Sequence, residues 1–528
     1  MTTDNRMELN GEHPSLSAIA AQFEIQLCDR VNGRPWDDFL KRFPIHFCRQ
    51  HGVLALEPTA NETLPVMIGD PKGVMALDTI RRSFGRSVQP LFVHPAEVQN
   101  AINTAYESQG GKAKEVVDSI AIENEASLSE MNDDLLDSSG RAPVIQLVNQ
   151  ILFEAIKSRA SDIHIQPSDS SVVARFRIDG VLFNTVEIPK PLQDEVVSRI
   201  KVLGNMNVAE KRLPQDGRAT VRIADRVIDL RIASLPTSHS ERVVIRLLDK
   251  SARLYTMTDL GMPTQTRSRF ENLISLEHGL LLVTGPTGSG KSTTLYAALQ
   301  QISTEERNVV TLEDPIEYEL DGVSQTQINE KKGLTFARGL RNVLRQDPDI
   351  IMVGEVRDKE TAVMAIQSSL TGHLVFSTLH TNDSASAVTR LLDLGIEPYL
   401  VSSSLMAVLA QRLVRRICPA CRIEVEPDRT LYGWLESSSA RIPETVYEGK
   451  GCDSCRGTGF SGRVGIYELL TIDEPCRRLI QDRENASRIR EHALAAGMTL
   501  LAADGLCKVE EGKTTLGEVV RVAQRSSD

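Results

Sequence analysis

The sequence predicts a multidomain α/β protein in which one domain is built on a parallel sheet. Its 528 residues suggest about three or four domains, since a typical domain has roughly 150 residues. From about Leu280 onward, short apolar segments alternate with segments of helical spacing, as in a parallel sheet covered by helices on both faces. A glycine-rich loop separates the first of these strands from its helix. Length, alternation and loop together define the expected fold class.

Composition excludes several kinds of protein. Hydrophobic residues make up 41% and charged residues 25% of the chain, so neither a disordered nor a fibrous protein fits. The net charge of −11 argues against a protein that coats nucleic acid by bulk charge. Met1–Asn10 contains no apolar core segment, and the uncharged stretch Pro398–Gln411 is too short to span a membrane. We therefore expect an intracellular protein without a transmembrane helix.

The amino-terminal part is expected to form a small α/β unit. Phe43–Leu56 and Val66–Ile68 are predicted as short strands, and Leu77–Phe84 and Glu97–Tyr106 as helices, from the spacing of their apolar residues. Residues 111–140 then contain eight acidic residues and two lysines. This acidic segment is either a flexible tether or a solvated helix, and in both cases it separates two domains.

A second α/β unit with a half-buried sheet is expected after the acidic segment. Apolar and polar residues alternate in three predicted strands, Ile163–Ile165, Val172–Ile178 and Val227–Ile232. Asp179–Gly180 predicts a turn, and the helix Asp194–Leu203 presents an apolar face to the sheet. Residues 201–250 contain ten Lys or Arg and six Asp or Glu. This basic stretch is either a solvated face or a source of arginines for a phosphoryl group.

The third unit carries the parallel sheet. Its predicted elements are the strand Leu280–Thr284, the helix Ser292–Ile302, the strands Val309–Leu312 and Ile350–Val353, the helix Lys359–Leu370 and the strand Leu374–Phe376. The alternation stops near Cys418. A cysteine-bearing segment and a mostly helical tail, Asp473–Gln524, are expected to follow.

The loop after the first strand matches the phosphate-binding motif GxxxxGK[ST]. Gly288 and Gly290 let backbone N–H groups turn toward phosphate oxygens, Lys291 reaches the β- and γ-phosphates, and Ser292 can hold Mg²⁺. The strand before the loop and the helix after it are the context that this mechanism requires. The nucleotide-binding residues expected are Gly285, Pro286, Thr287, Gly288, Ser289, Gly290, Lys291, Ser292 and Thr293.

Acidic residues follow two neighbouring predicted strands. Glu313 ends one strand, with Asp314 and Glu317 beyond it, and Glu355 follows the next. Because the carboxyl ends of parallel strands face the ligand crevice, Glu313 and Glu355 are expected to face phosphate and to activate water or complete the Mg²⁺ shell. The sequence does not separate their roles. For each acid alone, the alternative is a solvated loop carboxylate.

Two histidines flank the last predicted strand of the sheet. His380 follows the strand, so it can contact the terminal phosphate or a neighbouring carboxylate and report the bound nucleotide. His373 precedes the strand and is the weaker candidate. A structural role is the alternative for both.

Two CxxC pairs, separated by 30 residues, predict a metal site. Cys418, Cys421, Cys452 and Cys455 offer four thiolates on two tight turns, which fits a structural Zn²⁺ ion, whereas a single CxxC pair could be redox-active. The other cysteines, expected to be ordinary buried thiols, are Cys28, Cys48, Cys476 and Cys507.

These motifs together resemble those of the secretion ATPase superfamily. The segments that match its Walker A, Asp box, Walker B and His box motifs are Gly285–Ser292, Thr311–Glu317, Gln346–Ile350 with Gly354–Asp358, and Thr371–Val375 with Ser377–Asn382. The resemblance runs from Ser161–His164 to Arg463–Glu468. The two CxxC pairs are similar to those of the assembly ATPases and point away from the retraction ATPases of pili. Val356 stands where isoleucine is more usual, which leaves Glu355 in place.

The resemblance implies a RecA-like P-loop ATPase core, preceded by a PAS-like α/β domain and a small amino-terminal α/β domain, with a zinc-binding insert. It implies a hexamer that binds ATP, Mg²⁺ and Zn²⁺. Arg231 and Arg246 match two arginines that approach the phosphates in this family. The domains implied are 1–106 for docking, 107–141 as acidic linker, 142–255 with the arginines, 256–417 with the P-loop, 418–460 with the cysteines and 461–528 as helical domain.

The function implied is ATP hydrolysis that drives pseudopilus assembly and protein export by a type II secretion system. The partners implied are the cytoplasmic domain of an inner-membrane protein, the L component, and the polytopic platform protein, the F component. The protein would be cytoplasmic and peripherally attached to the inner membrane, with no nucleic acid partner. A type IV pilus assembly ATPase and a nucleotide-gated binding module without sustained turnover remain alternatives. A GTPase is disfavoured because no Asn-Lys-x-Asp motif occurs.

Overall fold

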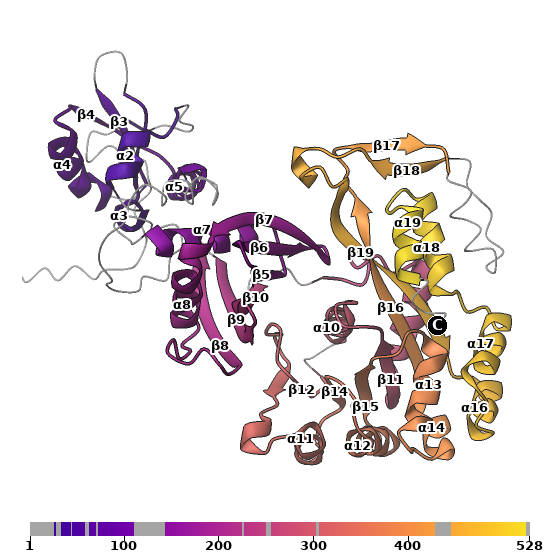
Figure 1. The fold of residues 1–528 in the computed structure, drawn as a ribbon. Helices are drawn as coiled ribbons and strands as arrows, with labels where there is room; N and C mark the ends of the chain where they lie inside the picture. The colour runs from indigo at the N-terminus through magenta and orange to yellow at the C-terminus, as the bar shows by residue number, and fades with distance from the viewer. Residues whose placement is uncertain are drawn as a thin grey trace, which may run out of the picture. The chain divides into compact units, whose positions relative to one another are not determined.

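The computed structural model describes residues 26–27, 33–43, 45–58, 63–69, 72–109, 143–223, 226–249, 255–302, 306–427 and 445–523. The chain forms two compact units, residues 1–251 and 252–528, each with its own sheets (Figure 1). The acidic segment expected from the sequence lies outside the described residues, as does Cys28. Among the described helices, none is long and apolar enough to cross a membrane.

The amino-terminal sheet has four short strands in the order β1-β4-β3-β2. These strands are β1 (Gln26–Leu27), β2 (Val53–Ala55), β3 (Leu64–Ile68) and β4 (Val88–Phe92). The helices of this part are α2 (Asp37–Arg42), α3 (Ile45–His51), α4 (Lys72–Phe84) and α5 (Pro95–Gln109). The helices expected near Leu77–Phe84 and Glu97–Tyr106 are confirmed as α4 and α5.

The strand expected over Phe43–Leu56 is wrong for most of its length, because Ile45–His51 forms α3. Its aromatic rings meet at helical spacing, with 4.8 Å between the ring centroids of Phe43 and Phe47 and 4.7 Å between those of Phe47 and His51. A dense run of apolar residues does not by itself distinguish a buried helix from a strand.

The second sheet of the first unit is antiparallel and has six strands in the order β7-β6-β5-β10-β9-β8. Its strands are β5 (Asp162–Pro167), β6 (Ser171–Ile178), β7 (Val181–Pro189), β8 (Gln215–Ile223), β9 (Arg226–Thr237) and β10 (Ser240–Asp249). The expected turn at Asp179–Gly180 joins β6 to β7, and both residues have positive φ, as type I′ hairpins require.

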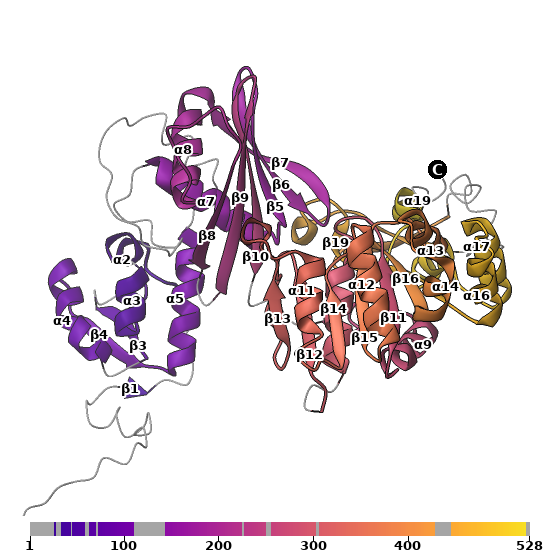
Figure 2. The same cartoon turned by 90° about the horizontal axis from the view of Figure 1, so that it is seen from below.

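One face of this six-stranded sheet is covered by two helices, α7 (Pro143–Lys157) and α8 (Gln193–Leu203), as Figure 2 shows. Buried residues of both helices pack with alternate residues of the strands, for example Leu152 and Ile200 with Ile245. Alternation along the strands sends the intervening residues to the other face. That other face is therefore the one on which Arg231 of β9 and Arg246 of β10 lie.

The sheet of the second unit has seven strands in the order β13-β12-β14-β15-β11-β16-β19. Its strands are β11 (Gly279–Thr284), β12 (Val309–Glu313), β13 (Ser324–Gln327), β14 (Ile350–Val353), β15 (Leu374–Leu379), β16 (Leu405–Ile417) and β19 (Phe460–Thr471). All neighbours pair in parallel except β16 and β19. The predicted strands 280–284, 309–312, 350–353 and 374–376 are confirmed.

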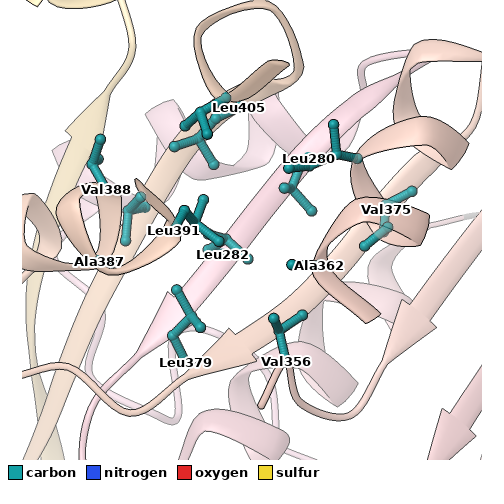
Figure 3. Packing of buried hydrophobic residues seen from close by; sticks show 14 of the residues in the cluster. Leu280, Leu282, Val356, Ala362, Val375, Leu379, Ala387, Val388, Leu391 and Leu405 are labelled. Carbon is teal, nitrogen blue, oxygen red and sulfur yellow. The ribbon is translucent and has the colours of Figure 1, made fainter. Parts of the chain in front are cut away.

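Helices and apolar cores lie on both faces of this sheet. The helices are α9 (Thr264–Ile274), α10 (Lys291–Gln301), α11 (Phe336–Val343), α12 (Lys359–Leu370), α13 (Ser384–Asp393) and α14 (Pro398–Ser404). Figure 3 shows Leu282 of β11 and Leu405 of β16 among the buried side chains of α12 and α13. Strands buried on both faces explain the continuous apolar segments of the sequence.

The structure adds one strand to the sheet after the expected end of the alternation near Cys418, since β19 pairs with β16. The uncharged stretch Pro398–Gln411 divides into α14 and the first half of β16, and β16 reaches Ile417. The tail is mostly helical, as expected, with α16 (Glu474–Gln481), α17 (Ala486–Ala495), α18 (Leu501–Glu510) and α19 (Leu516–Ala523). A two-stranded ribbon of β17 (Arg422–Val425) and β18 (Val446–Gly449) accompanies the cysteine segment.

The six-stranded sheet contains a buried ion pair that should dominate its local stability. Lys201 Nζ lies 2.7 Å from Glu241 Oε1, and the two side chains are 1% and 3% exposed. Nζ also donates to the Glu210 carbonyl at 2.7 Å, and the Ser234 hydroxyl donates to Glu241 at 2.8 Å. Removal of one partner leaves the other charge buried and unpaired.

We expect Lys201→Ala to lower the opening free energy of β10 by about 3–5 kcal/mol, measured by amide hydrogen exchange. The control is Lys211→Ala, whose ion pair with Asp194 is about half exposed on both sides and should contribute about 0–1 kcal/mol. Equal losses of protection in the two variants would contradict the prediction.

Candidate active site

The phosphate loop begins where β11 ends, in the interior of the seven-stranded sheet. Gly285, Gly288 and Gly290 all have positive φ, and Gly290 caps α10. A Cβ at Gly285 would lie 2.4 Å from the Gln411 carbonyl oxygen, and one at Gly290 would lie 2.8 Å from the Gln411 amide nitrogen. The loop is therefore pressed against β16, and only glycine fits at these two positions.

Lys291 closes the loop from the start of α10. Its Nζ donates to the carbonyl oxygens of Gly285 and Pro286 at 2.8 and 3.2 Å. Burial lowers the pKa of Lys291 to about 8, the Glu355 carboxylate opposes this shift, and the Arg412 guanidinium adds to it. Ser289 Oγ is buried and has no hydrogen-bond partner within the described residues. A cation and an unsatisfied hydroxyl in a glycine cradle fit phosphate oxygens.

Ser292 and Thr293 follow Lys291 in the first turn of α10, with Ser292 exposed and Thr293 half-buried. Thr294 is buried and donates to Gln411 Oε1 at 2.7 Å. Gln411 thus contacts both the helix and the loop, a role that sequence reasoning missed. Pairing of β16 with β11 explains it, because Thr284 lies opposite Ala410 and brings the next residue beneath the loop.

Glu313, at the end of β12, is buried in a network of hydrogen bonds. Its carboxylate accepts from the hydroxyls of Tyr296 and Thr311 and, at 3.0 Å, from the amide of Gln325. Only 4% of the residue is exposed. Glu317 lies near the same network, since its backbone N–H donates to the Tyr296 hydroxyl at 3.3 Å. Three donors leave Glu313 well satisfied inside the protein.

Glu355, which follows β14, has different surroundings. One carboxylate oxygen lies 2.5 Å from the Arg357 guanidinium and the other lies 3.3 Å from His380 Nε2. The Glu355 side chain is 12% exposed, whereas those of His380 and Arg357 are 45% and 64% exposed. The Glu355 carboxylate is therefore half-buried, and its two partners are more exposed than it is.

The loop after β15 is tied to the phosphate-loop strand. The hydroxyls of Thr284 and Thr381 lie 2.7 Å apart, and the Thr381 backbone N–H donates to Thr284 Oγ1. His380 is therefore held at the phosphate edge. His373 precedes β15 and lies at the opposite edge, where its carbonyl accepts from the Gly279 N–H. The structure does not bring His373 to the site.

Arg231 and Arg246 belong to the first unit, on β9 and β10. The strand register places them directly opposite each other. Arg246 Nε donates to Asp162 Oδ1 at 3.0 Å. The two arginines form one pair on the open face of the six-stranded sheet.

The four clustered cysteines come together at the ends of β16 and β19. Their sulfur atoms all lie within 4.8 Å of one another, with 3.9 Å between Cys418 and Cys452 and 3.7 Å between Cys421 and Cys455. Tetrahedral Zn²⁺ with Zn–S bonds of about 2.3 Å requires sulfur atoms about 3.8 Å apart. Backbone N–H groups of Gly451 and Gly459 donate to the sulfurs, as thiolates require. The cluster fits this ion.

Of the remaining described cysteines, two are buried as expected and one is exposed. Cys48 and Cys476 are buried, as predicted, and burial raises the pKa of their thiols to about 12 and about 11. Cys507 is exposed, so its prediction as a buried thiol is wrong. It lies on α18, whose buried face is formed by neighbours such as Leu506 and Val509.

The parallel sheet, the glycine cradle and the acidic residues at neighbouring strand ends define a P-loop ATPase. The chain belongs to the type II/IV secretion system protein family, which matches residues 137–521. A second match, to the MshEN domain, covers residues 23–112.

Two relatives illustrate the range of this family. The type II secretion system ATPase E of Vibrio cholerae is 46% identical over 461 residues, which cover 86% of this chain and 91% of the relative. The type IV pilus assembly ATPase PilB of Thermus thermophilus is 42% identical over 511 residues, which cover 95% of this chain and 56% of that protein.

A solved structure shows that the fold is shared. The ATPase DotB of Legionella pneumophila superposes with a TM-score of 0.54 at 21% identity, over 74% of this chain and 99% of that one. The α/β fold class with a RecA-like ATPase core, expected from the sequence, is confirmed.

The lowered pKa of Lys291 predicts a pH-dependent affinity for ATP. Below pH 8 the ammonium group is charged and attracts phosphate, and above pH 8 it becomes neutral. If only the charged form binds, the dissociation constant should rise about tenfold between pH 7 and pH 9. Titration with a fluorescent ATP analogue measures this change.

The control is Lys291→Arg, whose guanidinium stays charged throughout this range. It should bind more weakly at every pH and show no such rise. A wild-type affinity that is constant between pH 7 and pH 9 would contradict the prediction.

Proposed function

We propose that this chain is the ATPase of a type II secretion system, which hydrolyses ATP to drive pseudopilus assembly and protein export. The observation that carries the proposal is the phosphate edge of the seven-stranded sheet, where Lys291 bonds to the glycine cradle, Glu355 interacts with the charge of Lys291, and His380 contacts Glu355. Two relatives, named type II secretion system ATPase E and type II secretion system protein E, are 46% and 45% identical over most of their length and support the choice of machine.

In the proposed reaction, the loop N–H groups and Lys291 bind the phosphates of ATP. Ser292 and Glu355 would hold Mg²⁺, since both carry oxygen ligands and neither is fully buried. Glu313 and Glu317 are also proposed to take part in hydrolysis. Hydrogen bonds from Tyr296, Thr311 and Gln325 hold the Glu313 carboxylate in place. Mg²⁺ would neutralise charge that develops on the transferred phosphoryl group.

His380 is proposed to sense the nucleotide through Glu355. Its Nε2 lies 3.3 Å from the Glu355 carboxylate. A change in the charge near Glu355 therefore changes the electrostatic interaction between the carboxylate and the imidazole. Nothing in its placement supports the same role for His373.

Arg231 and Arg246 are proposed to reach the phosphates of a bound nucleotide in the assembled hexamer. Guanidinium groups stabilise the negative charge of a phosphoryl group in its transition state. Both arginines lie on the sheet face that α7 and α8 leave uncovered, and the phosphate loop belongs to the other unit. This placement favours contact with a nucleotide that is bound outside their own unit.

The same proposal assigns a role to each of the other parts of the chain. Residues 1–106 would dock on the cytoplasmic domain of the L component and 107–141 would link them to the arginine-bearing domain, 142–255. Residues 256–417 would carry the ATPase chemistry and would act on the platform F component, together with the helical domain 461–528. The cytoplasmic protein would thus be attached to the inner membrane through its partners.

Zinc is proposed for the cysteine segment, residues 418–460. Four cysteine ligands saturate a tetrahedral ion, so the site is structural. The segment packs on the tail, because the Ile417 N–H donates to the Lys513 carbonyl and Val446 contacts Val509 and Val519. Zinc would stabilise this junction.

The type IV pilus assembly ATPase stays a second candidate, because one such relative is 42% identical over nearly the whole chain. Both machines would use the same hydrolysis site. The difference between them lies in what the chain drives, so a cellular measurement separates them.

We expect Glu355→Gln to abolish steady phosphate release while ATP binding is kept, since the amide preserves shape and removes the charge that holds Mg²⁺. Cells with this variant as their sole copy should retain exported proteins in the periplasm. The control is Glu360→Gln, in an exposed ion pair with Arg341.

Sustained hydrolysis by Glu355→Gln would refute its role. Absence of hydrolysis in the wild-type protein with its partners would favour the nucleotide-gated binding module. Normal export with loss of surface pili would favour the pilus machine.

We expect Cys418→Ser to lower the zinc content of the purified protein from about one ion per chain toward zero. It should also lower the melting temperature, because the junction with the tail loses its cross-link. Cys507→Ser is the matched control, since Cys507 is an exposed thiol outside the cluster. Equal zinc content in both variants, measured by elemental analysis, would refute the site.

A further inference from the structure

A row of charged residues crosses the open face of the six-stranded sheet. Strand register places five residues side by side on β6, β5, β10, β9 and β8, in the order Arg177, Asp162, Arg246, Arg231 and Arg218. Their neighbours Ile163, Ile232 and Ile245 point into the core under α7 and α8. The row therefore lies on the face that these helices leave uncovered.

Four of these five residues are arginines, and three of them are direct cross-strand neighbours. Like charges that face each other on adjacent strands destabilise a sheet. Asp162 is the single carboxylate of the row, and it separates Arg177 from Arg246. An anion that meets the arginines would weaken the repulsion between neighbouring guanidinium groups.

Asp162 is fixed and nearly buried, whereas Arg246 is not. Asp162 is 6% exposed, and its Oδ2 accepts from the Ser161 hydroxyl at 2.8 Å and lies 3.6 Å from Arg177 Nε. Its Oδ1 accepts from Arg246 Nε at 3.0 Å, while the Arg246 side chain is 56% exposed. A rigid acceptor thus holds a largely exposed guanidinium.

The nitrogen that Asp162 engages decides what Arg246 can do. A guanidinium has one Nε–H and four N–H groups on its two terminal nitrogens, in a planar fork. Asp162 engages Nε, so the edge of the guanidinium between its two terminal nitrogens does not face this carboxylate. The terminal nitrogens are the donors that form paired hydrogen bonds to phosphate.

We propose that Asp162 is the positioning residue of Arg246, which it holds with the terminal nitrogens turned outward to a phosphoryl group. The inference rests on the proposed function, in which Arg246 reaches the phosphates of ATP. Asp162 itself touches no nucleotide. It fixes the direction of the guanidinium and offsets its repulsion by Arg177.

The test is steady-state ATP hydrolysis by the full-length protein and its variants. Asp162→Ala should lower kcat by about tenfold to a hundredfold, with a KM for ATP within about twofold, since misplacement of a catalytic group affects the chemical step. Asp162→Asn keeps an acceptor for Nε and should recover part of the loss. Asp169→Ala removes a carboxylate that is exposed and pairs with His239, and should retain wild-type kcat.

A double-mutant cycle identifies the route of the effect. In an Arg246→Ala background, Asp162→Ala should not lower kcat further, because no guanidinium remains to be oriented. A second, equal loss in that background would overturn the inference. The inference would also be overturned if kcat of wild type, Asp162→Ala and Asp162→Asn simply paralleled their melting temperatures, because a purely structural role of Asp162 would give that result.

Failure of the proposed function looks different. If Arg246→Ala retains wild-type kcat, the role of Arg246 falls, and the inference with it. If Arg246→Ala loses activity and Asp162→Ala does not, only the positioning role of Asp162 is refuted.

Discussion

The site depends on the parallel pairing of β11, β12, β14 and β15, because parallel strands place their carboxyl ends at one edge of the sheet. Lys291 follows β11 and Glu355 follows β14, yet their charges interact through this shared edge. β11 lies between β15 and β16, so the phosphate loop begins in the interior of the sheet. Gly285 and Gly290 of this loop are then required by the close approach of β16.

The same edge is fastened to the carboxy-terminal part of the second unit. Arg412 of β16 donates to Asn382, and Arg490 of α17 pairs with Asp383 at 3.0 Å. Glu468 of β19 accepts from the Ser384 backbone N–H, and burial raises the pKa of its carboxyl. Asn382, Asp383 and Ser384, which follow shortly after His380, are thus held by β16, α17 and β19 respectively. The helical tail is in this way part of the support of the site.

Local patterns predicted the elements whose chemistry is contained in a short stretch. The strand Leu280–Thr284, the loop after it and the helix α12 follow from apolar spacing and a motif of eight residues. The strand β16 did not, because Pro398–Gln411 shows one apolar run that tertiary contacts divide into helix and strand. Ile45–His51 was expected as strand for a similar reason, since buried helices and buried strands are both apolar.

The sequence by itself determined which residues are candidates to bind phosphate and metal, because the motifs of glycine, lysine and cysteine are defined by spacing along the chain. Only the tertiary structure decided which side chains meet. It surrounded Glu313 with internal hydrogen-bond donors, left Glu355 partly exposed beside Arg357 and His380, and put His380 and His373 at opposite edges of the sheet. It also joined Asp162 to Arg246 across two strands. Those distinctions follow from strand order and register, which depend on contacts between residues far apart in the chain.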